Sequence, residues 1–199
     1  MTASFWVILL AVLLYGLLHS WLASLGLKQR LSQRFGHAAE RGYRLAYNLI
    51  AVLTLLPVLV LPVALVDVEI YRIPLPWMAL CLAGQALAAL VLLASILHTG
   101  LMTFLGVCQL VRCEGEAPPK LVVTGLYRWV RHPLYTAGLL FIWLMPVMTW
   151  NLLALNLGVS VYIVVGAIFE ERKLLMEFGP DYAEYKRKTP MLIPGLNLK

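Results

Sequence analysis

Two short polar segments in the last third of the chain carry side chains that suit ligand binding. The first is Arg131-His132-Pro133. Proline favours the first turn of a helix, so Arg131 and His132 are expected at a helix N-terminus, where free N–H groups and the helix dipole attract an anion. The guanidinium adds a fixed charge, and a carboxylate would bind well there. The same residues are also common topology signals and phosphate anchors at a membrane boundary.

The second segment is Glu170-Glu171-Arg172-Lys173, which directly follows a long apolar stretch. Carboxylates at a membrane boundary are costly unless they are solvated or paired. Adjacent residues on one helix point about 100° apart, so only one of Glu170 and Glu171 is expected to face inward. An inward carboxylate would accept hydrogen bonds from a diol or an amino group. In the alternative interpretation, Arg172 and Lys173 are its partners at a solvated helix exit.

A third segment, residues 178–194, has aromatic side chains at helical spacing. Phe178, Tyr182 and Tyr185 fall on one face of a helix, and three basic residues follow at 186–188. This pattern suits an interfacial helix on an anionic inner leaflet. It suits a lid over a bound ligand equally well.

Composition places these segments in a membrane protein. The chain is 61% hydrophobic and only 13% charged, against about 25% charged residues in soluble domains. The net charge of +6 comes from short basic clusters between apolar stretches, as in cytoplasmic loops. No basic stripe with stacking aromatics occurs, so no nucleic-acid partner is expected. Glycine-rich nucleotide motifs, HExxH and CxxC are also missing, so no metal site is expected.

Four apolar stretches are long enough to cross a bilayer: residues 4–23, 45–66, 75–111 and 134–169. The segments 28–44, 112–131 and 172–199 are basic and are expected inside, whereas 67–72 is slightly acidic and is expected outside. Residues 75–111 must then cross once and residues 134–169 twice.

The double crossing by residues 134–169 is a helical hairpin that turns near Thr149-Trp150-Asn151, with about 17 residues in each arm. The expected fold is therefore an all-α polytopic integral membrane protein. It has about five transmembrane helices, a C-terminal helical hairpin and a cytoplasmic interfacial helix. Its N-terminus is expected outside and its C-terminus in the cytoplasm.

The order of the motifs over residues 121–194 is more specific than any motif alone. It reads Gly-x-Tyr-x-x-x-Arg-His-Pro-x-Tyr, hairpin, Glu-Glu, Phe-Gly-x-x-Tyr-x-x-Tyr, then Thr-Pro and Pro. This order closely resembles the isoprenylcysteine carboxyl methyltransferase superfamily. The upstream segments His19-Ser20, Glu40-Arg41, 104–109 and 143–149 look more like the methanethiol S-methyltransferase and NnrU-like branch.

The resemblance implies a binding site for S-adenosylmethionine (SAM) and a substrate path that opens between helices toward lipid. Residues 112–199 would form the SAM-binding core with the hairpin and a lid helix, and residues 1–111 the scaffold and substrate cavity. The implied cofactor-binding residues are Tyr127, Arg131, His132, Tyr135, Glu170 and Glu171, with Tyr182 and Tyr185 as neighbours.

Among four polar residues in apolar stretches, His19, Gln85 and His98 are costly in lipid and are expected to face the protein interior, whereas Gln109 is expected near the inner interface. His19 and Gln85 are expected to hydrogen-bond between helices. His98 and Gln109 lie close in sequence to the cytoplasmic cluster. His98 is therefore the candidate catalytic base, and Gln109 is the candidate substrate contact.

The leading hypothesis is a SAM-dependent methyltransferase in the bacterial inner membrane, with the lipid bilayer around it and a small or lipophilic thiol as acceptor. A thiol with a pKa near 8.5 benefits from a nearby base or positive charge. The alternatives are a carboxyl (isoprenylcysteine-type) or phospholipid-amine methyltransferase, and a non-catalytic NnrU-like membrane protein. The sequence predicts no oligomeric state.

Overall fold

The computed structural model describes residues 2–99, 102, 105, 107–108 and 121–196, apart from the side chains of 37–40, 96, 98 and 99. The chain is mostly helical and forms two compact units. The first unit contains Met1–Arg72, Ile96–Glu116 and Val147–Val159. The second contains Ile73–Ser95, Ala117–Pro146 and Ser160–Lys199.

Four of the described helices contain an apolar stretch long enough to cross a membrane. They are α1 (Ala3–Leu22), α3 (His37–Ala64), α4 (Trp77–Thr99) and α8 (Trp150–Lys188). Large apolar side chains on them are exposed, such as Leu17 at 60% and Val63 at 89%. A soluble protein would bury such residues, whereas a bilayer solvates them. The chain is an integral membrane protein, as composition predicted.

The hairpin exists, but its two arms are unequal. The first arm, α7 (Pro133–Trp143), has 11 residues, and at 1.5 Å per residue it is only about 16 Å long. The expected length of about 17 residues is wrong for this arm. Pro146 follows closely, and a proline disfavours helical backbone in the residue before it. The chain therefore leaves the helix early and reaches α8 through an extended connection.

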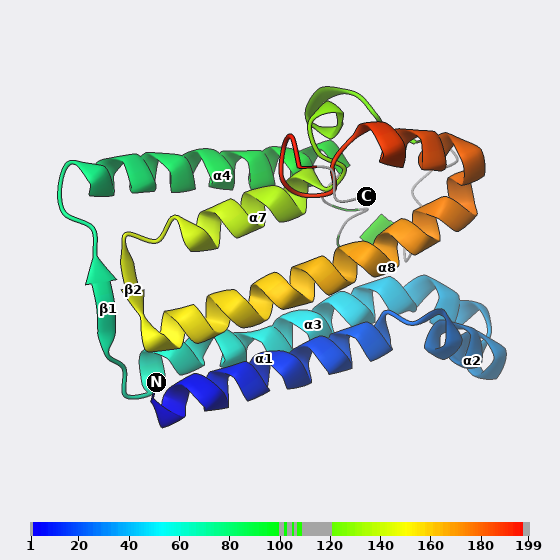
Figure 1. Ribbon diagram of the computed structural model, residues 1–199. Coiled ribbons are helices and arrows are strands. Elements are labelled where there is room, and N and C mark those ends of the chain that lie inside the picture. The colour runs from blue at the N-terminus through cyan, green and yellow to red at the C-terminus, as the bar shows by residue number, and fades with distance from the viewer. Residues whose placement is uncertain (1, 100–101, 103–104, 106, 109–120, 197–199) are drawn as a thin grey trace. The chain divides into compact units, whose positions relative to one another are not determined.

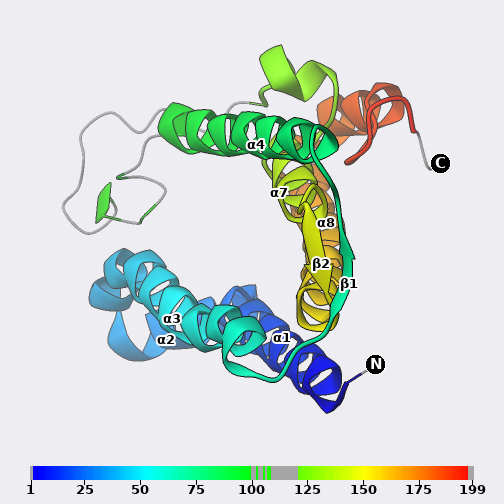
Figure 2. The same cartoon turned by 90° about the vertical axis from the view of Figure 1, so that its left-hand side faces the viewer.

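That connection contains the strand β2 (Val147–Thr149), which pairs antiparallel with β1 (Glu69–Arg72) (Figure 2). The Asp67 carboxylate also accepts a hydrogen bond from the Asn151 N–H at 3.1 Å. The two strands are an exception to the expected all-α fold. They join the segment at 67–72 to the turn of the hairpin, two connections that the distribution of basic residues predicts on the same side of the membrane.

In the first unit, α1 packs beside α3 (Figure 1). The core contains Phe5, Ile8, Val12, Val58 and Ala154, the last from the first half of α8. The helix α2 (Leu25–Phe35) follows α1 and has no buried residue. The Tyr47 hydroxyl of α3 lies 2.6 Å from His19 Nε2 of α1, which confirms the predicted helix–helix hydrogen bond.

In the second unit, α4 runs alongside α7 (Figures 1 and 2). The Gln85 side-chain amide donates to the Phe141 carbonyl at 2.9 Å, which confirms the second predicted helix–helix bond. Gly84 lies opposite Leu144, and a Cβ at Gly84 would be 2.7 Å from Leu144 Cδ1. The missing side chain therefore lets the two segments approach closely.

Candidate functional site

The site begins at a short 3-10 helix, η1 (Gly125–Arg128). Gly125 has a φ of +63°, a left-handed conformation that other residues adopt only with strain, and this explains the glycine of the Gly-x-Tyr motif. The chain then reaches His132, the residue that precedes α7, and Pro133 occupies the first helical position. This confirms the predicted helix start.

Helix α8 supplies the second side of the site. By Phe169 its apolar part has run about 20 residues, enough to cross the hydrocarbon core, so Glu170 lies just beyond that core. The helix bends at Gly179, where φ is +55°, and Pro180 starts the next turn. The segment 180–188 carries Tyr182 and Tyr185, which are buried at 1% and 9% exposure. The aromatic face is therefore packed against protein.

Arg131 is buried and bound on several sides. Its Nε donates to Glu171 Oε1 at 2.5 Å, and its second terminal nitrogen pairs with the same oxygen. The first terminal nitrogen donates to the carbonyls of Lys186, at 3.0 Å, and Thr189. Lys186 Nζ binds the other Glu171 oxygen at 2.8 Å. Arg131 and Glu171 therefore tie α7, α8 and the C-terminal segment together.

Residues 189–194 form a strap across the start of α7, called here the C-terminal strap. The Arg131 N–H donates to the Pro190 carbonyl at 2.9 Å, and the His132 N–H donates to the Met191 carbonyl at 3.2 Å. The Thr136 hydroxyl donates to the Leu192 carbonyl at 2.7 Å. The N–H groups of Arg131 and His132 are therefore engaged by the C-terminal strap.

His132 lies between the two carboxylates. Its Nδ1 is 3.7 Å from Glu170 Oε2, and its Nε2 is 3.5 Å from Glu171 Oε1. Tyr135 stacks on the imidazole and donates its hydroxyl to Glu170 Oε2 at 2.8 Å. The burial agrees with the prediction that only one glutamate faces inward, because the Glu171 side chain is 5% exposed and the Glu170 side chain is 45% exposed, although both carboxylates come within 4 Å of His132.

Two buried polar atoms of the described site make no hydrogen bond: His132 Nε2 and the Tyr182 hydroxyl. Buried polar groups are nearly always paired, so each such atom needs an explanation, and a ligand is one. Tyr185 packs edge-on against Tyr182 and donates to the Tyr127 carbonyl at 2.6 Å. Contacts thus link the eight residues of the expected cofactor set in two groups, one of Arg131, His132, Tyr135, Glu170 and Glu171 and one of Tyr127, Tyr182 and Tyr185.

The structure does not test the candidate catalytic base His98 or the candidate substrate contact Gln109. His98 lies in the last turn of α4, and its side chain is outside what the structure describes. Gln109 lies outside the described residues altogether.

The charges of the site act on its ionisable groups. Burial raises the pKa of Glu171, but the nearby His132 imidazole and the hydrogen bonds from Lys186 and Arg131 outweigh it and lower the pKa to about 2. Burial, together with the nearby Glu170 carboxylate, raises the pKa of Tyr127. Glu171 is therefore ionised at neutral pH, and Tyr127 is protonated.

Three contributors were missed from the sequence. Lys186 was interpreted only as part of a basic cluster, yet it binds Glu171. Thr136 and the buried Thr189 hold the C-terminal strap through a side chain and a carbonyl. The Thr-Pro motif was a usable signal for Thr189. Main-chain contacts of this kind leave no signal in residue type.

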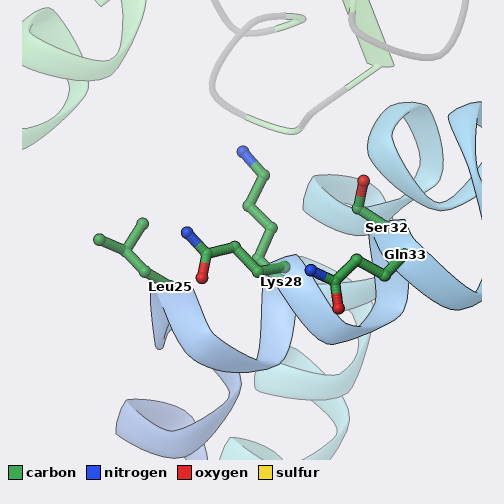
Figure 3. A pocket seen from close by; sticks show the side chains of 5 residues that line it. Leu25, Lys28, Ser32 and Gln33 are labelled. Carbon is green, nitrogen blue, oxygen red and sulfur yellow. The ribbon is translucent and has the colours of Figure 1, made fainter.

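Two hollows lie near described helices. One, of about 670 Å³, runs along the exposed side of α2 by Leu25, Lys28, Ser32 and Gln33, whose side chains project from one helix (Figure 3). The other, of about 350 Å³, is walled by α4, α7, η1 and the C-terminal strap. Only the second adjoins the polar site, because Val130 and Pro133 line it.

Comparison with known protein families shows the family to which the chain belongs. The family model for phospholipid methyltransferases matches residues 81–181, about half of the chain and most of the site. The chain belongs to the phospholipid methyltransferase family. This confirms the resemblance found in the motif order, since isoprenylcysteine and thiol methyltransferases are among the relatives.

The relatives of this family member include methanethiol S-methyltransferase 2 of Bradyrhizobium diazoefficiens, 48% identical over 36% of this chain and 27% of that protein. A methanethiol S-methyltransferase of Pseudomonas is 34% identical over 73% of this chain and 56% of that protein. Human protein-S-isoprenylcysteine O-methyltransferase is 34% identical over 43% of this chain and 31% of that protein. The chain thus spans between about a quarter and just over half of these relatives. No solved structure matches this family member.

Proposed function

We propose that this protein is an integral membrane methyltransferase that takes SAM as donor and a small or lipophilic thiol as acceptor. One observation carries the proposal: the His132 imidazole, held between Glu170 and Glu171, with a buried Nε2 that makes no hydrogen bond. Family membership supports the reaction class. The methanethiol S-methyltransferases among the relatives support the acceptor class.

The residues of the site fit SAM. Its amino acid part carries an ammonium and a carboxylate, and its ribose carries a diol. The half-buried Glu170 would accept from the diol or the ammonium, and His132 Nε2 and the Tyr182 hydroxyl would bind polar atoms. When bound, SAM supplies an electrophilic methyl group for an in-line displacement.

The protein's own residues would do three things. Arg131 is fully engaged, so in this proposal it positions Glu171 and the C-terminal strap instead of contacting the cofactor. The aromatic residues Tyr127, Tyr182 and Tyr185 exclude water, which strengthens the electrostatic contacts. His98 stays the candidate for taking the thiol proton, and Gln109 the candidate acceptor contact. Residues 112–199 would hold the cofactor, with residues 1–111 as scaffold and part of the acceptor cavity.

Isothermal calorimetry with S-adenosylhomocysteine on the purified full chain tests the cofactor site. The wild type is expected to bind. His132→Ala and Glu170→Gln are expected to weaken binding about tenfold or more, because each removes a hydrogen-bonding group from a charged site. The matched control is Glu177→Gln, an exposed glutamate farther along α8. A wild type that does not bind would instead support the non-catalytic NnrU-like alternative.

An acceptor panel with labelled SAM tests the other half of the proposal. It compares short thiols, prenylcysteine analogues and aminophospholipids. Label is expected on thiols. Label on phospholipid amines alone, or on prenylcysteine carboxyls alone, would contradict the thiol assignment and leave the cofactor site intact.

A further inference from the structure

The cavity beside the polar site is lined almost entirely by carbon. Its wall comes from α4, η1, α7, their flanking residues and the C-terminal strap, and consists of Gly84, Leu87, Ala88, Val91, Leu126, Trp129, Val130, Pro133, Thr136, Ala137, Leu140, Leu144 and Pro194. The one hydroxyl among them, on Thr136, already bonds to the carbonyls of Leu192 and His132. The indole N–H of Trp129 is the other polar side-chain group in the wall, and no charged side chain lines the cavity.

The position of the cavity relates it to the reaction. Val130 and Pro133 line it, and they flank Arg131 and His132 in the chain. Pro194, at the end of the C-terminal strap, lines it as well. The same two segments thus wall the cavity and hold the polar site, so a molecule in the cavity would lie beside the cofactor-binding residues.

The size of the cavity limits its occupant. At about 350 Å³ it is at the small end of ligand pockets, which run from about 300 to 1,000 Å³. Ala88 is small and buried at 5% exposure, whereas the space beside Gly84 is already filled by Leu144. One alkyl chain of moderate length fits such a space, whereas the rest of a larger lipid would have to lie outside it.

Resting on the function proposed above, we propose that this cavity binds the alkyl chain of the thiol acceptor, and that Ala88 and Leu144 determine the chain length it accepts. Apolar burial would supply the binding energy, since the wall has no charged side chain and is formed almost entirely by apolar groups. The preferred acceptor class is therefore an uncharged thiol with a single apolar chain.

The test measures kcat/KM for straight-chain thiols from methanethiol to dodecanethiol. Ala88→Leu fills the cavity and is expected to lower kcat/KM for the long thiols at least tenfold relative to its kcat/KM for methanethiol. Leu144→Ala enlarges the cavity and is expected to shift the optimum to longer chains. The matched control is Ala89→Leu, because Ala89 is exposed on α4 and does not line the cavity.

The outcomes separate this inference from the proposed function. If the wild type methylates thiols but Ala88→Leu and Leu144→Ala keep its chain-length profile, the cavity is not the acceptor site. An equal loss for every thiol in Ala88→Leu, with no shift in Leu144→Ala, would also overturn it. If the wild type methylates no thiol, the proposed function fails and this inference fails with it.

Discussion

At the scale of single residues, the neighbouring side chains of Arg131 and His132 have different surroundings. The Arg131 guanidinium is saturated by Glu171 and by two main-chain carbonyls, whereas His132 keeps a buried nitrogen without a hydrogen bond. A saturated group holds structure, and an unsatisfied buried group is where a ligand gains most. The arginine of the Arg-His-Pro motif is therefore best understood as the support for its histidine.

Glu171→Gln is expected to destabilise the protein in a pH-dependent way. The variant leaves Arg131 buried beside a neutral partner, which costs about 3–5 kcal/mol. The pKa of Glu171 is lowered from 4.5 to about 2, so its charge stabilises the fold fully above pH 4.5. This contribution is lost as the pH falls from 4.5 to about 2, and the variant and the wild type then converge.

Thermal unfolding in detergent at pH 7 and at several values below 4.5 measures this difference. Glu177→Gln is the control, since its side chain is exposed on the same helix. A gap between Glu171→Gln and wild type that stayed constant across the whole range would contradict the lowered pKa.

Tyr135→Phe is expected to loosen Glu170 without unfolding the site. It removes one hydroxyl that donates to Glu170 Oε2 at 2.8 Å and keeps the ring that stacks on His132. A hydrogen bond to a charged group contributes about 1.5–3 kcal/mol, so affinity for S-adenosylhomocysteine should fall about tenfold. Calorimetry measures it, with the exposed Tyr71→Phe as control. Unchanged affinity would remove Glu170 from the cofactor site.

Residue type and order were enough to predict that these ionisable groups have partners nearby, because ionisable groups at a membrane boundary need partners. They could not show which partners. Lys186 and the carbonyls of the C-terminal strap come close to Arg131 only because the helix bends at Gly179. Such a bend changes the direction of the chain but leaves no mark in the pattern of polar and apolar residues. The pairing of Arg131 was therefore beyond the sequence.

At the scale of elements, the contact between α1 and α8 depends on a glycine. A Cβ at Gly158 would lie 2.9 Å from Val12 Cγ1 and 3.0 Å from its Cβ. Val12 is buried at 4% exposure and its branched side chain is stiff, so it cannot easily move away. Gly158→Ala should therefore destabilise the first unit by about 1–3 kcal/mol through overpacking.

Gly166→Ala is the matched control on the same helix, because nothing lies within 4 Å of a Cβ at that position. This change should be neutral or slightly stabilising, since alanine favours helix over glycine. Thermal unfolding of both variants in one detergent measures the contrast. Equal midpoints for the two variants would show that α1 and α8 do not approach this closely.

Hydrophobic length and charge predicted the long helices well, because a bilayer demands about 20 apolar residues in a row. They did not predict where α7 ends or that two short strands pair, because these features depend on local backbone conformation. The apolar stretch at 134–169 continues through Pro146, so its composition hides the early end of α7. The pairing of β1 with β2 was also hidden, since strands of four and three residues have too little alternation to detect.

At the scale of the whole molecule, we predict from the basic clusters that β1 lies on the outer side of the membrane and the polar site on the cytoplasmic side. The pairing of β1 with β2 supports a shared side for the two connections, and basic segments are retained in the cytoplasm. In a background without native cysteines, Glu69→Cys should react with a membrane-impermeant maleimide on spheroplasts of a bacterial host. Glu177→Cys should react only after permeabilisation, as the control for membrane integrity. The reverse pattern would place the site away from cytoplasmic SAM and contradict both the topology and the proposed function.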